Sequence, residues 1–322
     1  MKIGNLKEYL AQHGAKPLKT GQSGAEVYEI EEKYVLKYVR RENLESEELF
    51  RTYQKEVLFY SMGNCIPDSK KSSAEDRTAA ERKLPLPQVF AARASEDELM
   101  LLMKKYERPK RKEINRELLK KILYALAQVH SAEIPQFLRQ KTAAEPFSEA
   151  QIRESLHGWQ AVLLEHPGAF EAKWLPQIAA RINDVLLWHN SEKQILNHGD
   201  FHWDNLLVGD SGEILICDWQ SVSVGGASGD LSFLLSRLSA DGIWAEAREA
   251  VALYAEAAEK LTGKRPDCEA LLGHMAAANL MTSFRFWHGY MHGSTEERVR
   301  GIYEAMWEDF CRLLPGEERT LQ

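Results

Sequence analysis

The sequence predicts an α+β protein in which a small antiparallel sheet with one main helix precedes a larger, mostly helical part. Strand-like runs rich in β-branched and aromatic residues are concentrated in the first third of the chain. They lie near 27–30, 33–39, 88–94 and 99–103. From residue 115 onwards, apolar residues recur mainly at helical spacing, apart from one short segment. We therefore expect an N-terminal lobe at 1–103, a connection at 104–107 and a C-terminal lobe at 108–322.

The composition fits a globular protein and argues against several classes of partner. Of the 322 residues, 44% are hydrophobic and 28% are charged, and the four cysteines form no C-x-x-C pair. The formal net charge of −7 argues against nucleic-acid binding, which usually requires a basic surface. No apolar run is long enough to span a bilayer, and the start of the chain lacks a signal-peptide core. We expect a cytoplasmic protein without nucleic-acid or membrane partners, either a monomer or a homodimer.

A glycine-rich turn opens the first lobe. Gly21 and Gly24 flank Ser23, and a strand begins at Val27. Glycines let the backbone approach a phosphate closely, and its N–H groups can then bind the phosphate. A simple hairpin turn would contain the same residues, and no Walker A lysine follows this one.

A lysine and a glutamate of the same lobe are suited to act as a pair. Lys37 lies in the strand at 33–39, and Glu56 lies among apolar residues on one face of the helical stretch at 44–62. Because an unpaired glutamate is costly to bury, we expect Glu56 to form an ion pair with Lys37. Glu48, on another side of the same helix, is the alternative partner.

A polar insertion separates this helix from the last strands of the lobe. Residues 64–83 contain almost no large apolar side chains, and we expect a solvated loop or a frayed helix there. The strands at 88–94 and 99–103 then complete a five-stranded sheet whose first strand follows Pro17.

The densest group of chemically active residues lies at 195–220. The motif HGDFHWDN places Asp200 five positions before Asn205, and two apolar runs joined by the turn GDSGE then lead to Asp218. Such a hairpin brings Asn205 and Asp218 to the same end of its strands. Carboxylate and amide oxygens are hard ligands suited to Mg²⁺ beside phosphate oxygens. Asp200 then remains available to accept a proton from a substrate hydroxyl.

HGDFHWDN followed by ICDWQ resembles the catalytic and metal-binding loops of the aminoglycoside phosphotransferase and choline kinase family. The family pattern is H-G-D-x-H-x-x-N and then a hydrophobic strand ending in D-W or D-F, and every fixed position is met. The resemblance extends from the glycine-rich turn to the terminal helices. It implies a protein-kinase-like fold of two lobes, and Mg²⁺-dependent phosphoryl transfer from ATP or GTP to a hydroxyl of a small molecule.

The resemblance also implies roles for residues of the second lobe. Asp200 is expected to orient and deprotonate the acceptor hydroxyl, and Asn205 and Asp218 are expected to hold Mg²⁺. His202 either approaches the transferred phosphoryl group or braces the loop. His198 is expected to brace the loop.

The resemblance assigns nucleotide binding to the first lobe. Lys37 is expected to contact the phosphates, Glu56 to hold Lys37, and the hinge at 104–107 to bind the adenine through backbone groups. The residues assigned to the nucleotide are Gly21, Ser23, Gly24, Lys37, Glu56 and Met103.

The sequence supports fewer predictions for the remaining helices. The helix at 115–131 ends near His130, which we expect to pack and to form hydrogen bonds. Asp230 either caps a helix or braces the catalytic loop from its start. One long helix is expected at 268–290. The resemblance places the acceptor site among the C-terminal helices without identifying its residues.

The acceptor is open between several classes of small molecule. An aminoglycoside-type antibiotic or a similar amino alcohol or sugar is favoured, and choline, ethanolamine and homoserine are alternatives. An alternative of another class is a nucleotide-binding protein without turnover. A protein kinase is disfavoured because the D-F-G and A-P-E signatures are absent.

Overall fold

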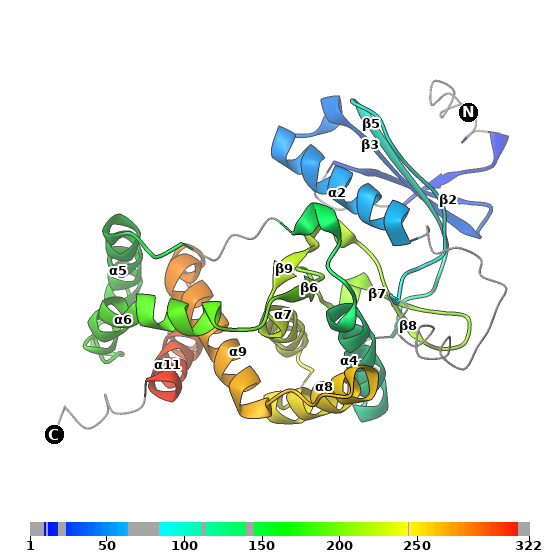
Figure 1. The fold of residues 1–322 in the computed structure, drawn as a ribbon. Coiled ribbons are helices and arrows are strands. Elements are labelled where there is room, and N and C mark those ends of the chain that lie inside the picture. Colours follow the sequence, from blue (N-terminus) through cyan, green and yellow to red (C-terminus); the bar gives the residue numbers. More distant parts are fainter. Residues whose placement is uncertain are drawn as a thin grey trace.

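The predicted five-stranded antiparallel sheet is confirmed. The computed structural model describes residues 10, 12–18, 24–63, 84–110, 114–139, 145–243 and 245–314. The strands are β1 (Lys16–Pro17), β2 (Glu26–Ile30), β3 (Tyr34–Arg40), β4 (Val89–Ala94) and β5 (Glu98–Lys104), in the order β1-β2-β3-β5-β4. The helix α2 (Glu47–Gly63) lies beside this sheet (Figure 1). Gly21, Ser23 and the insertion at 64–83 lie outside the described residues.

The alternation of side chains along β3 determines how α2 packs on the sheet. Val39 lies opposite Leu99 of β5, and both are buried against Phe50 and Tyr53 of α2. Each fully buried aromatic side chain contributes roughly 1.5–3 kcal/mol. Lys37 is two residues before Val39 and therefore faces the same helix, because side chains along a strand alternate with a period of two.

Helices make up most of the second part of the chain. They are α4 (Arg116–Ser131), α5 (Glu149–Leu164), α6 (Trp174–Asn190), α7 (Ala227–Ala240), α8 (Ala247–Thr262), α9 (Cys268–Thr282), α10 (His288–Met291) and α11 (Glu296–Leu313). The Asn115 side chain caps α4, and Ser148 and Gln151 form a capping box at α5, so the sequence fixes where both helices begin.

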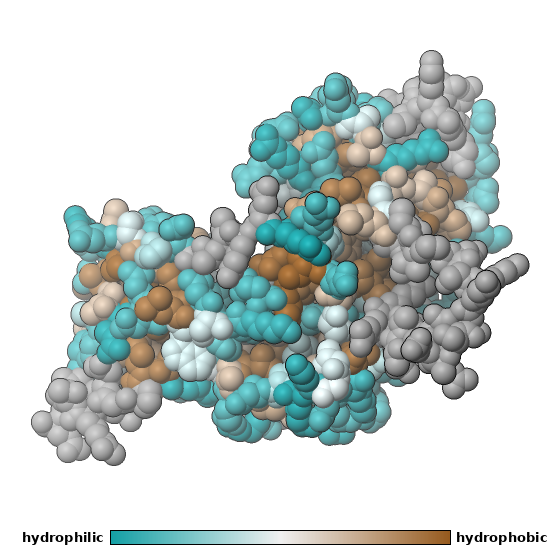
Figure 2. Space-filling model, in the orientation of Figure 1, coloured by the Kyte–Doolittle hydropathy of each residue, from teal (hydrophilic) through white to brown (hydrophobic). Residues whose placement is uncertain are grey.

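Two hydrophobic cores organise these helices. One core joins α4, α7 and α8 to the end of α2 and to β5, and the other lies between α5, α6, α11 and the end of α9. In Figure 1, the second group of helices lies on the left, away from the sheet. Figure 2 shows hydrophobic residues most densely at the junction between the sheet and the helices.

Two short strand pairs lie at this junction. The strands β6 (Ile195–Asn197) and β9 (Ser223–Gly225) form one pair, and β7 (Leu206–Val208) and β8 (Ile214–Ile216) form the predicted antiparallel hairpin. The Val208 amide donates to the Glu107 carbonyl oxygen at 2.8 Å, so the hairpin is attached to the connection that follows β5.

The long helix expected at 268–290 is confirmed as continuous helical structure, but its second half is not a regular α-helix. α9 ends at Thr282, and a π-helical turn at Ser283–Trp287 leads into α10. The Trp159 indole nitrogen donates to the carbonyl oxygens of Ser283 and Phe284, both at 3.2 Å. This inserted side chain gives a physical reason for the change of geometry, because a donor that binds helix carbonyls disturbs the i to i+4 ladder.

Candidate active site

Lys37 of β3 lies in an ion-pair network at the junction of the two parts. Its Nζ is 2.8 Å from Oε2 of Glu56 on α2 and 2.9 Å from Oδ1 of Asp218, which follows β8. Burial lowers the pKa of Lys37, but the two carboxylates outweigh burial and raise it above its usual value. The ammonium group therefore stays charged, and its contact with Asp218 joins Lys37 to a residue 181 positions away in the sequence.

Glu56 is the partner predicted for Lys37, and their ion pair is confirmed. Its side chain is almost entirely buried, with the residue 1% exposed, whereas Glu48 is exposed. The second carboxylate oxygen of Glu56 accepts a hydrogen bond from the Trp219 backbone N–H at 3.2 Å. The Trp219 ring stacks on Phe59 of the same helix at 4.4 Å between centroids. Glu56 thus holds the segment after Asp218 as well as the lysine.

Asp200 and Asn205 are joined by hydrogen bonds within one loop. The Asn205 side-chain amide donates to the Asp200 carbonyl oxygen at 2.9 Å and to Oδ2 of Asp200 at 3.1 Å. The Nε2 atom of His202 is 3.5 Å from the same Oδ2. The contact with His202 is the main cause that lowers the pKa of Asp200. Asp200 is therefore an ionised carboxylate at neutral pH, and 39% of its side chain is exposed to solvent.

The β7–β8 hairpin brings Asn205 and Asp218 to one end, as the sequence predicted. Leu206, directly after Asn205, pairs with Ile216, and the Cys217 amide donates to the Asn205 carbonyl oxygen at 2.9 Å. Asp218 leaves the strand in a left-handed conformation, with φ at 65° and ψ at 63°. This conformation is uncommon for residues other than glycine and is typical of functional sites.

Two buried side chains hold the Asp200 loop in place. The carboxylate of Asp230, in the first turn of α7, accepts hydrogen bonds from the amides of His198 and Gly199, both at 2.8 Å. His198 contacts the Cys217 carbonyl oxygen through Nε2 at 3.0 Å and accepts from the Asp200 amide at 3.3 Å. Both residues therefore brace the loop, as expected, and Gly226 rather than Asp230 is the N-cap of α7.

His130 packs beneath this brace. One ring nitrogen lies 2.8 Å from the Tyr254 hydroxyl and the other lies 3.2 Å from the Asp230 carboxylate. The expectation that His130 packs and forms hydrogen bonds is confirmed, and its ring links α4 to α7 and α8.

Gly24 and Met103 are the other described residues assigned to the nucleotide. Gly24 has φ at 75°, and a Cβ atom there would lie 3.2 Å from the Asn43 carbonyl oxygen, so glycine fits this tight turn. Met103 pairs with Val35 across the sheet and is buried in the core beside the connection. Neither residue takes part in the network of Lys37.

The sequence profile of the phosphotransferase enzyme family (APH) matches residues 14–265. The chain belongs to this family. The family predicted from the loop motifs is therefore confirmed, and the protein is a phosphotransferase. No curated protein sequence matches the chain.

Solved structures of similar fold are themselves aminoglycoside phosphotransferases. The ADP-bound structure of APH(2'')-Ib has a TM-score of 0.54 at 14% identity, covering 98% of this chain and 100% of that one. The GDP and kanamycin complex of APH(2")-IIia has a TM-score of 0.54 at 12% identity, with 97% and 100% covered. An aminoglycoside phosphotransferase from Alicyclobacillus acidocaldarius has a TM-score of 0.55 at 13% identity, with 95% and 92% covered. These similarities establish the kinase-like fold.

Gln220 is a site residue of the phosphotransferase to which the sequence assigned no role. Its side-chain amide donates to Oδ1 of Asp218 at 2.5 Å, the oxygen that Lys37 also contacts. In the sequence, the only sign of this contact was the position of Gln220 two residues after Asp218. Burial raises the pKa of Asp218, but Lys37 and Gln220 outweigh burial and lower it below the usual value.

Asn205 and Asp218 each carry an oxygen atom of the chemical type that a hard divalent cation prefers. Oδ1 of Asp218 is occupied by Lys37 and Gln220, and the amide nitrogen of Asn205 is occupied by Asp200. Oδ2 of Asp218 and the amide oxygen of Asn205 are the atoms suited to Mg²⁺. Within the described ranges, no group of three or more His, Cys, Asp or Glu residues could hold a metal ion. A cation at this place would therefore need further oxygen ligands, such as phosphate.

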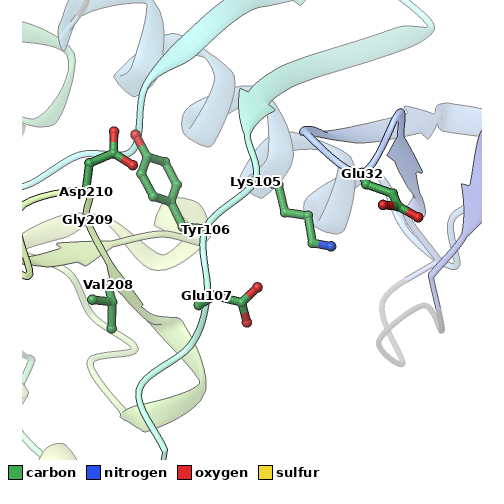
Figure 3. A pocket seen from close by; sticks show the side chains of 7 residues that line it. All are labelled: Glu32, Lys105, Tyr106, Glu107, Val208, Gly209 and Asp210. Carbon is green, nitrogen blue, oxygen red and sulfur yellow. The ribbon is translucent and has the colours of Figure 1, made fainter.

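A separate shallow pocket lies at the connection after β5. Lys105–Glu107 form its middle, Glu32 lies on one side, and Val208–Asp210 lie on the other (Figure 3). Lys105–Glu107 belong to the hinge that the sequence assigned to the adenine, whereas none of the residues assigned to catalysis or to the metal line this pocket. None of the helices in the described part of the phosphotransferase has both the length and the apolar character needed to cross a membrane.

Proposed function

We propose that this phosphotransferase transfers the γ-phosphoryl group of ATP or GTP, bound with Mg²⁺, to a hydroxyl group of a small molecule. The observation that carries the proposal is the network in which Lys37 contacts Glu56 at 2.8 Å and Asp218 at 2.9 Å. An ammonium group held by two carboxylates where the sheet meets the catalytic loop is suited to bind phosphates. Membership of the phosphotransferase enzyme family supports the same reaction class.

Asp200 is the proposed base for the acceptor hydroxyl. Its lowered pKa keeps it ionised, and Asn205 and His202 orient the carboxylate. The carboxylate accepts a hydrogen bond from the hydroxyl and takes its proton as the hydroxyl oxygen bonds to the γ-phosphorus. The bond from that phosphorus to the β–γ bridging oxygen breaks in the same transfer, and ADP or GDP leaves. His202 thus helps to position Asp200, which is the bracing role left open by the sequence.

Charge neutralisation would come from both lobes. Lys37 holds the phosphates, and Glu56 keeps the lysine in place. Asn205 and Asp218 would hold Mg²⁺, which supplies positive charge to the phosphate oxygens. Most of the catalysis in such a site is positioning and electrostatic stabilisation.

The remaining nucleotide contacts are proposed from the sequence. Gly21, Ser23 and Gly24 would cover the phosphates, and Met103 and the hinge at 104–107 would lie beside the adenine. The lobe boundaries at 1–103 and 108–322 and a cytoplasmic location belong to the same proposal. A cytoplasmic location is consistent with an ATP-dependent enzyme that acts on small metabolites or antibiotics.

The test combines nucleotide binding with turnover. Calorimetry with ATP and GTP, with and without Mg²⁺, should detect binding that depends on the metal and weakens in Lys37→Ala. ADP or GDP release is then measured over amino sugars, choline, ethanolamine and homoserine. Amino sugars come first because one protein of similar fold was solved with kanamycin. Release that depends on one acceptor supports the proposal. Nucleotide binding without release over a broad panel of hydroxyl compounds would favour a binding protein without turnover.

A further inference from the structure

The side chain two positions after Asp218 contacts the same carboxylate oxygen as Lys37. The amide of Gln220 donates to Oδ1 of Asp218 at 2.5 Å, and Nζ of Lys37 lies 2.9 Å from that oxygen. A carboxylate oxygen has two lone-pair sites, so these two donors use both sites of Oδ1. The carboxylate is therefore held in one orientation, and Oδ2 is the oxygen to which neither donor is bound.

Gln220 lies in a short turn that is anchored independently of its side chain. This is the 3-10 turn Trp219–Ser221. The Trp219 indole donates to the Ile216 carbonyl oxygen at 2.9 Å, and the Val222 amide donates to the Trp219 carbonyl oxygen at 3.2 Å. Trp219 and Val222 are both completely buried. The backbone on each side of Gln220 is thus fixed, and the turn presents its amide to the carboxylate.

Gln220 and Lys37 differ in what they can do for Asp218 in the presence of phosphates. Lys37 is the proposed phosphate contact and also pairs with Glu56 at 2.8 Å, so other anions compete for its ammonium group. The Gln220 amide is neutral, and phosphates attract it much less strongly. It also adds no positive charge that would repel a cation beside Asp218. Gln220 is therefore suited to hold Oδ1 of Asp218 while Lys37 contacts phosphate.

We propose that Gln220 is a positioning residue that keeps Oδ2 of Asp218 available to the cation bound with the nucleotide. The inference rests on the proposed function, in which Asp218 holds Mg²⁺. Hydrogen-bond partners of metal-ligating carboxylates fix the orientation of the ligand, and their loss typically weakens metal binding 10- to 100-fold. Gln220 thus supports the part of nucleotide binding that depends on the metal and contributes little to the part that does not.

The experiment measures the affinity for ATP by calorimetry, with excess Mg²⁺ and with EDTA, for wild type and Gln220→Met. Methionine is similar in length and cannot donate a hydrogen bond to Oδ1. With EDTA, the variant should bind ATP about as tightly as wild type, because Lys37 and Glu56 are unchanged. With Mg²⁺, it should bind ATP roughly tenfold more weakly than wild type. Ser221→Ala, at an exposed position of the same turn, is the matched control and should behave as wild type in both conditions.

The two conditions separate a positioning role from a merely structural one. A general disturbance of the site would weaken ATP binding equally with Mg²⁺ and with EDTA, and such an equal loss in Gln220→Met would overturn the inference. If wild type binds ATP equally well in both conditions, the proposed metal site is itself wrong, and the inference is wrong with it. A metal dependence in wild type that Gln220→Met keeps in full would contradict the role of Gln220 alone.

Discussion

Replacing Glu56 by glutamine tests whether the buried ion pair prepares Lys37 for phosphates. The substitution keeps the side-chain shape, and the glutamine oxygen can still accept from the Trp219 amide. It removes the negative charge 2.8 Å from Nζ of Lys37 and leaves Asp218 as the lysine's described carboxylate partner. A hydrogen bond to a charged group contributes about 1.5–3 kcal/mol. We therefore expect kcat/KM for ATP to fall roughly 10- to 150-fold.

The assay is the initial rate of ADP release at varied ATP and saturating acceptor. The KM for the acceptor should change much less than the KM for ATP, because Glu56 does not contact Asp200, the proposed base. Glu48→Gln, on the exposed side of the same helix, is the matched control and should behave as wild type. If Glu56→Gln keeps the wild-type kcat/KM for ATP, the network does not serve the nucleotide.

Further predictions concern the support of the loop. Gly199→Ala should destabilise the fold by roughly 2–4 kcal/mol, because φ is +82° and the new Cβ would lie 2.2 Å from the Ser221 carbonyl oxygen. Gly168→Ala has a similar φ without a close neighbour and should cost less in the same urea titration. Asp230→Asn should cost about 2–4 kcal/mol by losing the charged acceptor of two loop amides. Burial raises the pKa of Asp230, but the donors around it, His130 first, lower it below the usual aspartate value. Its contribution is therefore complete above about pH 4 and is lost on further acidification. Unfolding titrations at several acidic pH values should show this loss in wild type and little of it in Asp230→Asn.

The sequence predicted the parts of the site that depend on short-range spacing. The hairpin after Asn205 follows from two apolar runs and a glycine turn, so the proximity of Asn205 and Asp218 could be inferred locally. The Lys37–Glu56 pair could be inferred because a glutamate on an apolar helix face needs a partner. Both inferences use patterns that lie within a few dozen residues.

Other features depend on contacts between distant segments and left no pattern in the sequence. The π-helical turn after Thr282 coincides with a hydrogen bond from the Trp159 indole of α5. The spacing of apolar residues within 268–290 gives no sign of this contact. Gln220 is intermediate, since its spacing from Asp218 was visible but its hydrogen bond was not.

The most direct test of the proposed mechanism is single-turnover phosphoryl transfer by Asp200→Ala, with the affinity for Mg·ATP measured on the same samples. Asp200 does not contact the Lys37 network in the described structure, so nucleotide affinity should stay near that of wild type. The transfer rate should fall on the order of 10²- to 10⁴-fold if this carboxylate takes the hydroxyl proton. A variant that binds nucleotide and transfers the phosphoryl group at the wild-type rate would contradict the assignment of Asp200 as the base.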